Sequence, residues 1–167
     1  LRCLVGSEMC IRDRPGSQPL ARLKSGFRTL LLRSSTPLLI VPEITSKINS
    51  ALLAYDGSPK ADEALFLAAY LAGRWSMALT VLSVNEDKQD SSESLHIAQT
   101  YLSDHDVEAT FVEEEGSVGD AILDATDKHR CNLIIMGGYS HHAIVQAVVG
   151  STLDYVLRNA FQPVLVC

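Results

Sequence analysis

The amino-acid sequence predicts an α/β domain built on an open, five-stranded parallel sheet with helices on both faces. From residue 51 onwards, short apolar runs alternate strictly with longer segments of helical periodicity. This alternation is typical of parallel strands joined by right-handed helical crossovers. The chain has 167 residues, 47 % of them apolar, which is enough for one domain with a closed core and a remainder.

The first strand and helix are predicted within residues 51–75. The run ALLAYD at 51–56 is apolar with few charges, as expected of a strand buried on both faces of a parallel sheet. Ser58 is placed to cap the next helix, and Pro59 to occupy its first position. One helical face is apolar and can lie on the sheet. It consists of Ala61, Ala64, Leu65, Ala68, Leu71 and Ala72.

The later elements repeat this pattern. The further strands are predicted at 78–84, 107–113, 131–136 and 163–167, and the further helices at 91–105, 117–130 and 151–160. The strand at 107–113 alternates apolar and polar residues, which indicates one partly wet face and a position near a sheet edge.

Composition limits the classes of partner. The net charge is −6 and no Lys/Arg-rich run is present, so the sequence predicts no nucleic-acid partner. The apolar stretches are shorter than the roughly 20 residues of a membrane span, which predicts no membrane partner. The four cysteines form neither a C-x-x-C pair nor a disulfide framework. We therefore expect a reducing, cytoplasmic location.

Two predicted strand ends carry residues suited to ligand binding. Residues 55–58 (Tyr-Asp-Gly-Ser) stand at the end of the first strand, and residues 136–138 (Met-Gly-Gly) at the end of the fourth. In open α/β sheets, ligands bind at the carboxyl ends of strands where the strand order reverses. Glycines let backbone N–H groups approach an anion, and the helix start at 150–152 (Gly-Ser-Thr) offers free N–H donors. Neither the P-loop nor the G-x-G-x-x-G pattern is present.

These features together resemble the universal stress protein family. The resemblance rests on the strand entering 56–58, the run Gly-Ser-Val-Gly-Asp-Ala-Ile at 116–122, and Gly137 followed by Gly150 and Ser151. It covers about residues 48 to 167. It implies an adenine nucleotide alpha hydrolase-like fold with strand order 3-2-1-4-5, which places the first and fourth strands side by side.

The resemblance also implies a site for ATP or AMP, with Mg²⁺ as an accompanying ion. Asp56 would meet the adenosine end, Val84 would line the base pocket, and Gly137 would face ribose and phosphates. Ser140 stands where the family pattern has a glycine; a serine in a left-handed conformation costs about 1 kcal/mol relative to glycine. The residues predicted to hold the nucleotide are Asp56, Gly57, Ser58, Val84, Gly137, Ser140, Gly150, Ser151 and Thr152.

Each signal also has a purely structural explanation. Asp56 can organise a turn, residues 137–138 can serve close backbone passage, and Ser151 with Asp154 fits a helix capping box. Two functions therefore stay open: a stress-response module that binds an adenine nucleotide and acts through its bound state, or a pairing or scaffold module that binds none. No catalytic residue or metal ligand is predicted, and slow ATP hydrolysis by a positioned water stays open.

The first 50 residues are interpreted as three segments. Residues 1–25 show no periodicity and are predicted to be unstructured; CLVGSEMCIRDR within them resembles translated sequencing-adapter read-through, which would make them artefactual. Residues 26–43 echo the end of the chain, with Pro37 and Pro163 lying 126 residues apart, about one domain length. They are predicted to be the last helix and strand of a preceding universal stress protein domain, and 44–50 the linker to the domain at 51–167.

This repeat predicts how the chain pairs. An apolar edge strand seeks a partner, so we expect residues 37–41 to lie antiparallel beside 163–166, with a poorly packed helix at 26–34. The predicted partner is a second universal stress protein domain, or a second copy of the chain in a homodimer, joined through the last strand.

Overall fold

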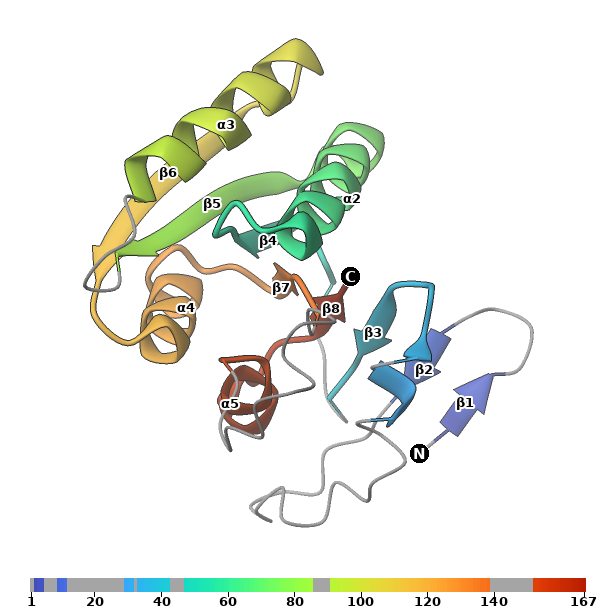
Figure 1. The fold of residues 1–167 in the computed structure, drawn as a ribbon. Coiled ribbons are helices and arrows are strands. Elements are labelled where there is room, and N and C mark those ends of the chain that lie inside the picture. The colour runs from blue at the N-terminus through green and yellow to red at the C-terminus, as the bar shows by residue number, and fades with distance from the viewer. Residues whose placement is uncertain are drawn as a thin grey trace.

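A six-stranded sheet forms the centre of the molecule, in the order β3-β8-β7-β4-β5-β6 (Figure 1). The computed structural model describes residues 2–4, 9–11, 29–31, 33–42, 47–85, 91–138 and 152–167. The strands of this sheet are β3 (Leu38–Ile40), β4 (Ser50–Ala54), β5 (Ala78–Asn85), β6 (Ala109–Glu115), β7 (Leu133–Met136) and β8 (Val164–Val166). The helices are α2 (Pro59–Trp75), α3 (Ser91–Asp104), α4 (Val118–Lys128) and α5 (Thr152–Asn159).

The five strands β4 to β8 are parallel to one another and confirm the predicted fold. Counted from β4, their order is 3-2-1-4-5, because β4 pairs with both β5 and β7 and β7 pairs with β8. The first and fourth strands are therefore neighbours. β6 lies at one edge of the sheet, as its alternating sequence predicted.

Two apolar cores lie on opposite faces of the sheet. Leu53 of β4 belongs to the core beneath α2 and α3, and its neighbour Leu52 belongs to the core beneath α4 and α5. Successive side chains of a strand point to opposite faces, so a strand with helices on both sides is apolar throughout. No helix among the described residues is both long and apolar enough to cross a membrane.

The start of α2 follows the sequence prediction. Ser58 has an extended conformation, and its Oγ accepts a hydrogen bond of 3.2 Å from the backbone N–H of Ala61. Pro59 occupies the first helical position, where its missing N–H costs nothing. All six residues predicted for the inner face of this helix are buried.

A close contact joins α4 to α5. A Cβ on Gly119 would lie 2.5 Å from Cδ1 of Tyr155, so only glycine lets the tyrosine ring pack there. The Tyr155 hydroxyl donates a hydrogen bond to the Asp120 carboxylate. This bond holds the pKa of Asp120 below its ordinary value and raises the pKa of Tyr155. Two residues of the run at 116–122 thus position a helix.

The sixth strand, β3, pairs antiparallel with β8 and confirms the predicted pairing of 37–41 with 163–166. Leu39 lies opposite Leu165 in this ladder. Residues 29–31 and 33 are helical, and none of these four is fully buried. Residues 26–28 and 32 of the predicted helix lie outside the described residues, so its poor packing stays a prediction. The sheet therefore has one strand more than the five predicted, because the segment before the domain supplies an edge.

The prediction for residues 1–25 needs one correction. Instead of lacking regular structure, residues 2–4 (β1) and 9–11 (β2) form a two-stranded antiparallel ladder (Figure 1). The ladder consists of backbone hydrogen bonds, which any residue except proline can make. A strand pair can therefore form without the side-chain periodicity that sequence analysis detects.

Candidate functional site

The candidate site lies at the carboxyl ends of three adjacent strands. Ala54 of β4 is level with Met136 of β7 and with Leu82 of β5. Asp56 lies two residues after Ala54, Val84 lies two residues after Leu82, and Gly137 lies one residue after Met136. Strand order and register therefore bring these three predicted site residues together at the carboxyl ends of adjacent strands, where the strand order of the sheet reverses.

The rest of the predicted site is only partly described. Thr152 is the first residue of α5 and is half-buried. Ser140, Gly150 and Ser151 lie outside the described residues, so their part in the site stays a prediction. Among the described residues, no cluster of three or more His, Cys, Asp or Glu side chains is arranged to hold a metal ion.

The turn after β4 is built by Asp56 and Gly57. Asp56 is exposed, and its Oδ1 accepts a hydrogen bond of 2.9 Å from the backbone N–H of Ser58. Gly57 has a φ of 74°, in the left-handed region that favours glycine. A carboxylate can accept about four hydrogen bonds, so the turn leaves Asp56 capacity for ligand hydroxyls. Ser58 caps α2 with its Oγ, which gives it a structural role.

Tyr55 is a buried neighbour of the site that was not among the residues predicted to hold the nucleotide. It is 3 % exposed, and its hydroxyl donates a hydrogen bond of 2.7 Å to the Asp62 carboxylate on α2. Burial, followed by the bond to Asp62, raises the pKa of Tyr55 well above its ordinary range. The phenol is therefore a fixed neutral donor that ties the end of β4 to α2. An apolar run interrupted by one tyrosine just before an aspartate was the signal available for it.

Both glycines after β7 make close backbone contacts. A Cβ on Gly137 would lie 2.9 Å from the carbonyl carbon of Lys60, in the first turn of α2. A Cβ on Gly138 would lie 2.7 Å from the carbonyl oxygen of Cys167, which accepts the N–H of Gly138 at 2.7 Å. Packing alone thus requires glycine at both positions, whether or not a ligand binds.

A polar network lies beside Val84, at the carboxyl ends of β5 and β6. Val84 is half-buried and packs against the core beneath α4 and α5. The next residue, Asn85, donates to Glu113 at 2.9 Å and accepts from the backbone N–H of Ser91 at 3.0 Å, and the Ser91 hydroxyl also donates to Glu113. This network fixes the start of α3 to the ends of β5 and β6.

The fold and the position of these residues define a doubly wound α/β domain with a candidate ligand site where the strand order reverses. Residues 47–167 match the family model described as the universal stress protein family. The chain belongs to this family, as its motifs predicted.

Individual relatives differ in how much of their own length the chain covers. It is 30 % identical over 135 residues to universal stress protein Slr1230 from Synechocystis, covering 77 % of this chain and 46 % of that protein. A universal stress protein from Archaeoglobus fulgidus is 24 % identical, with a TM-score of 0.74, over 96 % of this chain and 60 % of that one. The chain therefore spans about half the length of these relatives.

A third relative is a universal stress protein whose crystal structure is in complex with cAMP. It is 15 % identical, with a TM-score of 0.58, over 73 % of this chain and 98 % of that protein. At this identity the likeness concerns the fold.

Proposed function

We propose that this chain is a stress-response module that binds ATP or a related adenine nucleotide at the carboxyl ends of β4 and β7. The pairing of β4 with both β5 and β7 carries the proposal, because it brings the strand ends that hold Asp56, Val84 and Gly137 side by side. A relative of the same fold has been crystallised with cAMP, which supports an adenine nucleotide as ligand class. The module would act through its bound state.

Each described residue has a definite part in this proposal. The free lone pairs of Asp56 accept hydroxyls at the adenosine end, and the half-buried Val84 gives the base an apolar surface. Gly137 brings its backbone close to the phosphates, and the start of α5 at Thr152 adds N–H donors and a partial positive charge. Ser140, Gly150 and Ser151 are proposed to complete the phosphate side, with Mg²⁺ as a bound companion of the phosphates.

A pairing function is the second candidate, and the register of β3 and β8 favours it. The sequence repeat equates Leu38 with Val164, Leu39 with Leu165 and Ile40 with Val166. In the ladder, Leu39 pairs with Leu165, while Leu38 pairs with Val166 and Ile40 with Val164. Exchanging the two strands leaves this set of pairs unchanged, which is the mark of an isologous, two-fold contact.

The side chains follow the same symmetry. Leu39 and Leu165 both pack in the core beneath α2 and α3, and Ile40 and Val166 both pack in the core beneath α4 and α5. We therefore propose that β3 is the last strand of a preceding universal stress protein domain, joined to this one as a pseudo-dimer. A domain of this kind can serve as a scaffold without nucleotide, since packing already explains the glycines after β7.

Isothermal titration of ATP and AMP, each with Mg²⁺, into the 167-residue chain separates the two functions. We expect binding in the wild type and roughly tenfold weaker binding in Asp56→Asn, which loses a charged hydrogen-bond acceptor but retains an oxygen to accept the N–H of Ser58. Asp104→Asn is the matched control, because Asp104 is exposed at the far end of α3. If the folded wild type binds neither nucleotide at millimolar concentration, the scaffold function replaces the nucleotide-binding one.

A further inference from the structure

A cleft of about 450 Å³ lies between the segment preceding the domain and the first turns of α2. Its volume falls within the range of sites for small organic ligands. One side is lined by Leu31, Ser34, Ser35, Thr36 and Leu38. Lys60 and Glu63 line the other, and Gly138, Val166 and Cys167 contribute from the ends of β7 and β8. Half of its lining thus lies outside the span that matches the family model, which begins at residue 47.

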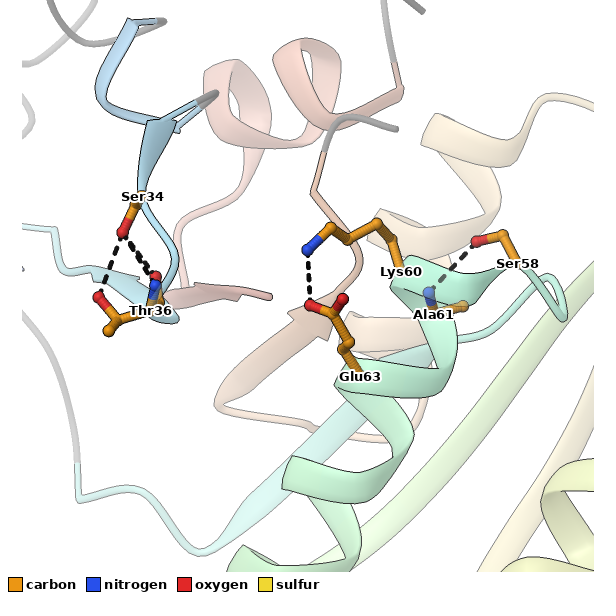
Figure 2. Close-up of polar contacts among 6 residues, drawn as sticks. All are labelled: Ser34, Thr36, Ser58, Lys60, Ala61 and Glu63. Carbon is orange, nitrogen blue, oxygen red and sulfur yellow. Dashed lines mark hydrogen bonds and ion pairs between the residues drawn. The ribbon is translucent and has the colours of Figure 1, made fainter. Parts of the chain in front are cut away.

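Hydroxyl groups gather on the first side of the cleft. Ser34, Ser35 and Thr36 all line it. The Ser34 hydroxyl donates a hydrogen bond of 2.8 Å to the carbonyl oxygen of Thr36, and the two hydroxyl oxygens lie 3.2 Å apart. These contacts hold the two hydroxyls together in one turn before any ligand arrives (Figure 2).

A lysine faces them from the second side, as Figure 2 shows. Nζ of Lys60 lies 2.6 Å from Oε2 of Glu63, and the Lys60 side chain is the more buried of the pair, at 28 % exposed against 54 %. An ammonium group has three N–H donors, and this ion pair uses one of them. A Lys–Glu ion pair also orients the lysine that contacts phosphates in protein kinases.

The thiol of Cys167 shares this environment without adding charge. Burial raises the pKa of Cys167 to about 11, with a further increase from the Glu63 carboxylate and a decrease from the Lys60 ammonium. The thiol is therefore neutral at physiological pH. Among the described lining residues, the charged side chains are then one ammonium and one carboxylate, and the ammonium lies opposite a row of neutral hydroxyl groups.

We propose that this cleft binds a phosphate ester. The two remaining N–H donors of Lys60 and the hydroxyls of Ser35 and Thr36 hold the phosphate, since ammonium and hydroxyl groups are strong donors to phosphate oxygens. Ser34, whose hydroxyl donates to the carbonyl oxygen of Thr36, fixes the turn that carries them. The organic part of the ester lies against the apolar wall formed by Leu31, Leu38 and Val166.

The ester can come from two sources. It is either the phosphate tail of the nucleotide, reaching past Gly138, or a separate small phosphorylated metabolite. In the first case the inference rests on the proposed nucleotide-binding function; in the second it stands alone. One wall comes from residues before position 47, where the match to the family model begins, and the other wall from residues after it. A bound ligand would therefore also stabilise the association of these two segments.

The test titrates ribose 5-phosphate, ATP and adenosine into the 167-residue chain and three variants. Lys60→Gln removes the ammonium group. Glu63→Gln frees the third N–H donor of Lys60 and removes a negative charge that repels phosphate. Lys128→Gln is the matched control. Lys128 makes the equivalent exposed ion pair with Glu114, at 2.9 Å. Heats of binding are read together with the backbone amide shifts of residues 34–36, and thermal unfolding checks that each variant is folded.

We expect ribose 5-phosphate to bind roughly tenfold or more weakly in Lys60→Gln, more tightly in Glu63→Gln, and unchanged in Lys128→Gln. If it also competes with ATP, the ester is the nucleotide tail; if it does not, the ester is a separate metabolite. Ribose 5-phosphate alone can fail to bind while Lys60→Gln weakens the binding of ATP and leaves that of adenosine unchanged. This result also identifies the ester as the phosphate tail of the nucleotide.

The inference is overturned if Lys60→Gln changes the affinity of neither ribose 5-phosphate nor ATP. Failure of the proposed function gives a different result: ATP, AMP and adenosine all fail to bind the wild type. Ribose 5-phosphate can then still bind, and its binding can still depend on Lys60.

Discussion

Replacing Gly119 by alanine is expected to destabilise the domain, because the new methyl group would meet the ring of Tyr155. The added Cβ would lie 2.5 Å from Cδ1 of the ring and 3.1 Å from Cε1, whereas carbon atoms in contact sit roughly 3.5–4.0 Å apart. The ring must then move by about 1 Å, which disturbs its hydrogen bond to Asp120. Overpacking of this kind costs roughly 1–3 kcal/mol.

An opposing effect sets the size of the change. Alanine is favoured over glycine in a helix interior by up to about 1 kcal/mol. The ring of Tyr155 is 40 % exposed and can move towards solvent, which keeps the packing cost in the middle of its range. We therefore expect Gly119→Ala to lower the free energy of unfolding by about 1 kcal/mol, measured by urea denaturation of the 167-residue chain.

The background variant Tyr155→Ala provides the control. Without the ring there is nothing for the methyl group to meet, so Gly119→Ala should then raise the free energy of unfolding by up to about 1 kcal/mol. The sign of the effect should reverse between the two backgrounds. Stabilisation by Gly119→Ala of equal size in both would show that α4 and α5 do not make this contact.

Three further predictions concern the strand pair, the site and pH. Leu39→Asp should speed hydrogen exchange at the β8 amides, because a charge cannot remain in the core; unchanged protection would exclude the β3–β8 ladder. In titrations with ATP, Gly150→Val should abolish binding and Ser140→Gly should tighten it or leave it unchanged; the reverse order of affinities would contradict the proposed phosphate cradle. The Tyr155 hydroxyl lowers the pKa of Asp120, so this contact stabilises the fold above the ordinary carboxyl pKa and is lost as pH falls through the lowered pKa. Tyr155→Phe should therefore lower the free energy of unfolding at neutral pH, and a loss of the same size in strong acid would refute the linkage.

Local sequence was sufficient to determine the elements of the domain at 51–167 and its fold class. Apolar residues at helical spacing identify α2 and its inner face, and Ser58 with Pro59 marks its start to the residue. These features depend on neighbours within a few positions, because helix periodicity and capping are local. The repeat of the chain's end at 26–43 likewise predicted the β3–β8 pairing. The order of the strands was accessible only through the family resemblance.

Tertiary structure decided which partners those elements meet. The contacts of Gly119 with Tyr155, of Gly137 with the first turn of α2, and of Tyr55 with Asp62 depend on register and on the distance between packed elements. Periodicity shows which face of an element is buried but not what covers it, and a glycine in a sequence does not reveal whether its close neighbour is a ligand, a ring or a backbone carbonyl. The cleft between Lys60 and residues 34–36 had no sequence signal for the same reason: its walls are far apart in the chain and meet only because β3 joins the edge of the sheet.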